Sequence, residues 1–197
     1  MPLRRSFALA AALLLAAPAG AQFQSEGYKF LQAVREAKSN DVIAALSRPG
    51  SVIVNTRDRS TGETALHITV RRGDLPYTSF LLAKGADANV RDGHGITPML
   101  AAIQEGHGDL VPLLVAGHAN PNLGSSSGVT PIILATQLRQ VETVRSLIAA
   151  NANPDQRDYN GMSARDYATR DPRASAIARL FADAPQVTHA PVAGPRL

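Results

Sequence analysis

The stretch from Gly93 to His107, GHGITPMLAAIQEGH, has the pattern of a turn, a helix start, a short apolar run and a second turn. Thr97 suits the N-cap position, because its hydroxyl can accept a hydrogen bond from a free N–H of the first helical turn. Pro98 loses nothing at the next position, where its missing N–H has no helical partner. Gly106 is the kind of residue that ends a helix. The stretch therefore predicts one short helix between two turns.

The same pattern returns along the chain in constant register. The glycines that precede the predicted helix starts are 33 residues apart each time: Gly62, Gly95, Gly128 and Gly161. The predicted N-caps keep this spacing: Thr64, Thr97, Thr130 and Ser163. So do the residues expected to end a second helix: Gly85, His118 and Asn151. A fixed period of this length indicates a solenoid, in which stacked repeats bury each other's apolar faces.

Each first helix should be followed by a second one, at residues 75–83, 110–116 and 141–150. Pro112 would break the interior of such a helix, at a cost of about 3 kcal/mol or more. We therefore expect the helix of that repeat to begin late, with Asp109 as its cap and Pro112 in its first turn. The Asp-, Asn- and Gly-rich turns that follow predict projecting, hairpin-like fingers. The finger LGSSSG at residues 123–128 lacks the Arg-Asp pair of the others and is expected to be the most mobile.

These segments resemble the ankyrin repeats. The period and the T-P-L-H-x-A signature of that family are similar to Thr64-Ala-Leu-His67, Thr97-Pro-Met-Leu100 and Thr130-Pro-Ile-Ile133, and Gly85–Asn89 matches the ending Gly-Ala-Asp-x-Asn. The resemblance implies an all-α fold, an ankyrin-repeat solenoid of about five helix pairs with hairpin-like fingers. The expected repeats are residues 26–58, 59–91, 92–124, 125–157 and 158–184, the outer two being degenerate.

In ankyrin repeats the signature histidine belongs to a structural hydrogen-bond network between neighbours. His67 alone retains it, and Leu100, Ile133 and Asp166 stand at the equivalent positions. The resemblance therefore leaves this network in doubt outside one repeat.

Composition argues against catalysis. The chain has no Cys, which excludes disulfides, thiol nucleophiles and Cys-ligated metals. The histidines fall on different elements without metal-ligand spacing: His67, His94, His107, His118 and His189. The serines at 125–127 lack the strand–turn–helix context of a nucleophile elbow and the lysine of a phosphate-binding loop. We expect no catalytic residue, no metal, no cofactor and no enzyme activity.

Residues 1–21 have the pattern of a secretory signal peptide. Arg4 and Arg5 precede an apolar run at residues 7–17, and Ala19-Gly20-Ala21 supplies the small residues of a cleavage site. A transmembrane helix needs about 20 apolar residues, more than this run offers. We expect periplasmic or secreted localisation after cleavage near Ala21, a repeat domain at residues 22–184 and a disordered Pro-rich tail at 185–197. Losing Arg4 and Arg5 lowers the formal charge from +4 to +2, which removes most of the case for a nucleic-acid partner.

The resemblance places partner binding on the fingers and the inner face of the first helices. The candidate binding residues are Arg57, Arg91 and Arg157 in the fingers, Arg71, Gln104, Gln137 and Arg170 at the first-helix ends, Arg72 and Glu105 beside them, and Arg59, His94 and Tyr159 near the finger tips. Family logic makes the finger aspartates structural and the arginines the outward groups. Arginine favours bidentate pairing with carboxylates, so the partner is expected to be a protein with acidic groups. The same residues would equally suit a solvated surface without a special role.

Two function classes follow for a monomer that neither binds nucleic acid nor inserts into a membrane. The first is an exported bacterial scaffold that supports or regulates an envelope protein. The alternative is a secreted effector that binds a protein outside the cell. An enzyme or small-ligand receptor is a distant third, because such sites are usually concave pockets.

Processing at the predicted site gives the first testable outcome. N-terminal sequencing of the exported protein should find Gln22 as the first residue, and a retained Met1 would refute the localisation. Arg4-Arg5-Ser6-Phe7 partly matches a twin-arginine signal. Export that continues when only the twin-arginine route is blocked would favour the general route.

Overall fold

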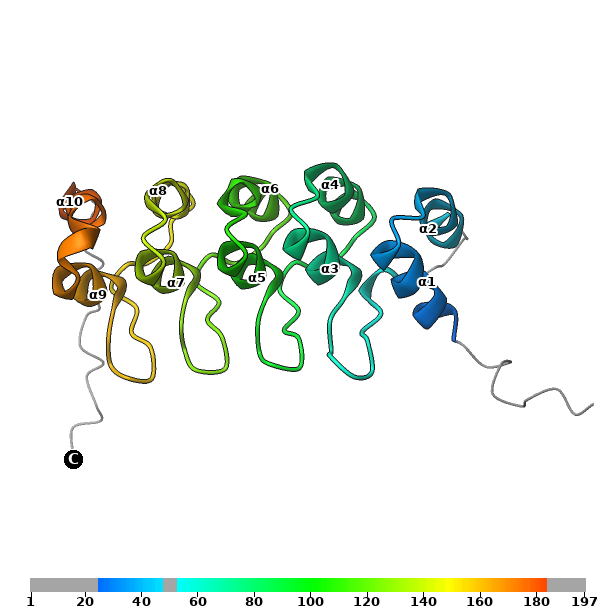
Figure 1. Ribbon diagram of the computed structural model, residues 1–197, viewed down its shortest axis with the longest axis horizontal. Coiled ribbons are helices and arrows are strands. Elements are labelled where there is room, and N and C mark those ends of the chain that lie inside the picture. Colours follow the sequence, from blue (N-terminus) through cyan, green and yellow to red (C-terminus); the bar gives the residue numbers. More distant parts are fainter. Residues whose placement is uncertain (1–24, 48–52, 184–197) are drawn as a thin grey trace, which may run out of the picture.

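The computed structural model describes residues 25–47 and 53–183, and every regular element within them is helical (Figure 1). The predicted signal peptide and tail lie outside the described residues. The described helices pair along the chain as α1 (Glu26–Arg35) with α2 (Ser39–Leu46), α3 (Ala65–Arg71) with α4 (Leu75–Ala83), α5 (Pro98–Gln104) with α6 (Val111–Ala116), α7 (Pro131–Gln137) with α8 (Val141–Ala149), and α9 (Ala164–Arg170) with α10 (Ser175–Asp183). Short 3-10 turns are η1 (Ile53–Asn55), η2 (Gly108–Leu110) and η3 (Pro172–Ala174). The predicted all-α solenoid of helix pairs is confirmed.

The helix pairs stack side by side in two rows (Figure 1). The first helices α1, α3, α5, α7 and α9 form one row, and the second helices form the other. Long loops project from the first row, on the side away from the second helices. These loops are the fingers: residues 57–63, 91–96, 124–129 and 157–162. The face made by the fingers and the first helices therefore runs the length of the solenoid.

The first helices begin as their sequence predicts. The hydroxyl of Thr97 accepts a hydrogen bond from the N–H of Leu100 at 3.3 Å, and Thr130 accepts one from Ile133 at 3.4 Å. The glycine before the cap must be a glycine: Gly95 has φ +78°, and a Cβ there would lie 2.6 Å from the Cβ of Ser126 in the next finger. The finger register is thus set by backbone conformation and by close contact between neighbouring repeats.

The core is a row of interfaces between repeats. Leu66, Met99 and Ile132 stand at equivalent positions of successive first helices and are at most 1% exposed. Isolated helices shorter than about 12 residues are marginal in water, and each of α3, α5 and α7 has 7. Their stability therefore depends on burial against the neighbouring pairs.

The helix that contains Pro112 begins late, as expected, but its start is built differently. α6 begins at Val111 with Pro112 in its first turn, after the 3-10 turn η2. The prediction that Asp109 caps this helix is wrong, because Asp109 lies inside η2 and Leu110 precedes the helix. The 3-10 turn already supplies a backbone bond there, from the N–H of Leu110 to the carbonyl of His107 at 3.1 Å.

The serine finger is hydrogen-bonded to both neighbours. Ser126 donates its hydroxyl hydrogen to the carbonyl of His94 at 3.1 Å, and the carbonyl of Ser127 accepts the N–H of Tyr159 at 3.1 Å. Ser125 replaces the usual aspartate, its hydroxyl accepting the N–H of Ser127 at 3.2 Å. That this finger is the most mobile stays a prediction.

The histidine network exists at His67 and is partly replaced in the last repeat. The His67 ring is buried, its Nδ1 accepts the N–H of Thr64 at 3.2 Å, and its Nε2 lies 3.0 Å from the carbonyl oxygen of Ile96 in the next repeat. Since a carbonyl can only accept, Nε2 carries the proton, and burial holds the pKa of His67 below its usual value. Asp166 takes over the bond within its own repeat, accepting the N–H of Ser163 at 3.0 Å.

Successive repeats are linked by three asparagines, Asn55, Asn89 and Asn122. These links were not predicted from the sequence. Each side-chain oxygen accepts a backbone N–H of the next repeat, and each side-chain amide donates to a backbone carbonyl there. Asn89 accepts from Asn120 at 2.7 Å and donates to the carbonyl of His118 at 2.9 Å. Asn55 and Asn122 make the same pair of bonds to the repeats that follow them.

Removing one of these links should destabilise the fold. Asn89→Ala leaves an N–H and a carbonyl without their partner, so we expect the free energy of unfolding to fall by about 1–3 kcal/mol. Chemical denaturation measures this. The matched control is Asn40→Ala in α2, where the exposed side chain makes no hydrogen bond to the described residues. Equal losses in the two variants would show that the link contributes nothing.

Candidate protein-binding surface

The arginines of the first and second fingers connect each finger to the next one. Arg57 donates from Nη2 to the carbonyl of Arg91 at 2.7 Å, and Arg91 donates from Nε and Nη2 to the carbonyl of Gly124 at 3.1 and 2.6 Å. Both arginines are exposed, as expected of outward groups, but each is held by a carbonyl of the next finger, because the stacked fingers bring these carbonyls within reach. A carbonyl carries no net charge, so both arginines keep their positive charge on this face.

Arg157 behaves differently. It donates to the carbonyl of Gly161 within its own finger and pairs with Asp166, Nη1 to Oδ2, at 3.4 Å. Its side chain is still 65% exposed. Arg157 is therefore open to solvent and at the same time partly neutralised by Asp166.

Arg71 is the centre of an ion-pair cluster. Its guanidinium contacts Glu63 at 3.0 Å, Asp92 at 3.4 Å and the candidate residue Glu105 at 3.2 Å. Three carboxylates from its own repeat, the next finger and the next first helix thus surround one cation. Arg71 and Glu105 hold repeats together, and with one cation against three carboxylates this cluster offers a partner no free positive charge.

Arg72 also bridges repeats. It donates to the carbonyl of Val34 at 3.0 Å and to Asp74 at 3.0 Å, and its guanidinium carbon lies 5.7 Å from the centre of the Tyr77 ring. This geometry uses both the donors and the flat face of the guanidinium.

The remaining candidates are exposed, at the finger tips and at the first-helix ends: Arg59, His94, Gln104, Gln137, Tyr159 and Arg170. Tyr159 is 80% exposed, the highest value among the large hydrophobic side chains that the structure describes. Arg59 and Arg170 form no ion pair with any described residue. These side chains are the ones that the fold leaves available.

The finger aspartates are structural, as the family pattern implies. Asp58 accepts hydrogen bonds from Ser60 and Thr61 and pairs with Arg35 at 2.7 Å. The hydrogen bond from the Ser60 hydroxyl, followed by the Arg35 contact, holds the pKa of Asp58 well below its usual value. Asp92 is 5% exposed and accepts the N–H groups of His94 and Ile96 at 2.8 and 2.9 Å.

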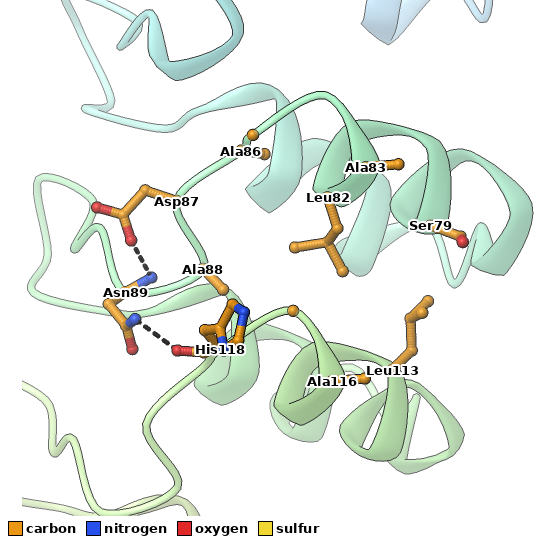
Figure 2. A pocket seen from close by; sticks show the side chains of 12 residues that line it. Ser79, Leu82, Ala83, Ala86, Asp87, Ala88, Asn89, Leu113, Ala116 and His118 are labelled. Carbon is orange, nitrogen blue, oxygen red and sulfur yellow. Dashed lines mark hydrogen bonds between the residues drawn. The ribbon is translucent and has the colours of Figure 1, made fainter.

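Two of the hollows in the surface have volumes near 500 Å³. Figure 2 shows the first, a hollow of about 500 Å³ between α4 and α6, where Leu82 and Leu113 extend from the two helices and Asp87 and His118 lie at one end. The second, of about 480 Å³, lies between α1 and the first finger and is lined by Tyr28, Leu31, Arg57, Asp58, Arg59 and Ser60. The sequence predicted neither hollow, because both depend on how neighbouring elements stack.

The described residues contain no group of three or more His, Asp and Glu side chains arranged to hold a metal ion. Within the same ranges, the helices are too short or too polar to span a bilayer.

Known ankyrin sequences match most of this chain. The family model for ankyrin repeats (3 copies) matches residues 30–125 and again residues 99–189. Potassium channel AKT1 of Arabidopsis thaliana is 45% identical over 58 residues, which are 29% of this chain and 7% of the channel. Neurogenic locus notch homolog protein 1 of Danio rerio is 37% identical over 91 residues, which are 46% of this chain and 4% of that protein. The match thus spans a small part of these much longer relatives.

The link between fingers can be tested at Arg91. Arg91→Ala removes two hydrogen bonds from a charged donor to the carbonyl of Gly124, so we expect the free energy of unfolding to fall by about 1–2 kcal/mol. Arg145→Ala in α8 is the control, because that arginine is 60% exposed and pairs only with Glu142 in the described chain. Exposed pairs of this kind contribute about 0–1 kcal/mol. An Arg91→Ala variant as stable as the control would mean that the finger arginines are not structural.

Proposed function

This chain belongs to the ankyrin-repeat family, whose repeats mediate protein–protein binding, and we propose that it is a non-enzymatic protein-binding scaffold that is exported to the periplasm and supports or regulates an envelope protein. The observation that carries the proposal is the long face of fingers and first helices (Figure 1). It offers one continuous surface for a partner.

The available side chains on this face suggest the chemistry of the partner. Arg59 and Arg170 are exposed cations near opposite ends, and Tyr159 projects from the last finger. Arginine and tyrosine are enriched at protein interfaces, and guanidinium groups pair readily with carboxylates. A protein that presents acidic groups therefore fits this face better than a nucleic acid does. We propose that the chain binds it as a monomer.

Export is supported by the sequence of residues 1–21, with its basic start, apolar run and small residues before Gln22. The same segment supports the alternative, a secreted effector that binds a protein outside the cell. The two differ in where the processed chain accumulates, so cell fractionation distinguishes them.

Partner capture should depend on the exposed end of the face. The double variant Tyr159→Ala with Arg170→Ala should capture the partner at least about tenfold more weakly in a crosslinking pull-down, because aromatic interface residues often contribute about 2 kcal/mol or more. Both side chains are exposed, so the melting temperature should stay close to that of the unchanged protein.

The control is Arg145→Ala with Arg179→Ala, which removes two exposed arginines from the second helices α8 and α10. If this control abolished capture and the Tyr159–Arg170 variant left it intact, the partner would bind the second-helix side.

A further inference from the structure

We infer that the hollow between α1 and the first finger binds an acidic peptide segment of the partner, in which an apolar side chain precedes an Asp or Glu. The inference rests on the proposed function, since it specifies the chemistry recognised at one end of the same face. It concerns a part of that face far along the chain from Tyr159 and Arg170.

The hollow has the size and composition of a peptide site. Its volume of about 480 Å³ lies in the range of ordinary ligand pockets, about 300–1,000 Å³. Leu31 is 2% exposed and contributes apolar wall, while Tyr28 is 44% exposed. The Tyr28 hydroxyl makes no hydrogen bond to the described residues. An apolar side chain laid against this ring would remove its exposed surface from water.

The charge of the hollow favours an anion. Among the described residues, Asp58 is the only acidic one that lines the hollow, and Arg35 already neutralises Asp58 at 2.7 Å. Within the described chain, the Arg57 side chain bonds only to the neutral carbonyls of Gly62 and Arg91. Arg59 has no ion-pair partner among the described residues. Two guanidinium charges therefore remain uncompensated beside an apolar wall, and Arg59 is the one whose donors are available to a carboxylate.

The hollow between α4 and α6 provides an internal contrast. It is also lined by aliphatic side chains, but the acidic residue Asp87 is among its described lining residues and no described Lys or Arg lines it (Figure 2). An acidic segment would be repelled there. Charge thus distinguishes two hollows of similar volume.

The test uses the whole chain from Gln22 onward and three N-acetylated peptides at millimolar concentration. The first is Gly-Phe-Glu-Gly with an amidated C-terminus, the second is amidated Gly-Phe-Gln-Gly, and the third is Gly-Phe-Gln-Gly with a free C-terminal carboxylate. Binding is followed by NMR through the backbone amide signals of the protein. We expect the Glu peptide to shift the signals of Tyr28, Arg59 and Ser60, and the amidated Gln peptide to bind about two- to fivefold more weakly.

Two variants locate the site. Arg59→Gln should weaken binding of the Glu peptide about two- to fivefold with the rest of the spectrum unchanged, since the exposed side chain makes no hydrogen bond or ion pair with the described residues. The control Arg145→Gln should leave binding unaltered. The inference is overturned if the two amidated peptides bind equally well, or if the protein prefers the peptide with the free C-terminus. It is also overturned if the shifts are confined to the α4–α6 hollow, or if no peptide shifts any signal.

The outcomes also separate this inference from the proposed function. If no peptide binds but partner capture still depends on Tyr159 and Arg170, only the inference about the hollow is wrong. If the peptide binds but partner capture does not depend on Tyr159 and Arg170, the proposal for the wider surface is wrong and the inference about the hollow stands.

Discussion

No single helix pair in this protein can bury its own apolar side, and the rest of the structure follows from that constraint. Helices of 7 residues gain stability only when Leu66, Met99 and Ile132 are covered by neighbouring pairs. Stacking at a constant interval then brings equivalent backbone groups of successive repeats to equivalent positions. A side chain that reaches a carbonyl in one repeat therefore reaches its counterpart in the next, as Asn89 and Asn122 both do.

This repetition determines which polar side chains are available for binding. Arg57 and Arg91 connect fingers, and Arg71 sits among three carboxylates. Side chains that look alike in the sequence thus divide into structural and available groups. Arg59 and Tyr159 belong to the available group, since the fold gives their side chains no polar partner within the described chain. Few charged side chains on this face are free to pair with a binding partner. The position of these charges therefore determines which partner fits, more than their number does.

The electrostatic character of the surface is local. The formal charge without residues 1–21 is close to neutral, yet one hollow carries unpaired guanidinium groups and another carries the carboxylate of Asp87. Charges near a surface interact over roughly 10 Å at ordinary salt concentrations. Recognition by this protein should therefore depend on which hollow or finger a partner contacts rather than on its net charge.

The period, the helix starts and the late beginning of α6 could be predicted from the sequence, because capping, proline geometry and glycine conformation act within a few residues. The family and its fold followed from the same local signals repeated in register. The cap at Asp109 was predicted wrongly, since a 3-10 turn replaced it. The roles of Arg91, Arg71 and Asn89, and both hollows, required the tertiary structure. Each depends on the distance between atoms some 20 to 35 residues apart in the chain, and that distance exists only once the repeats have stacked.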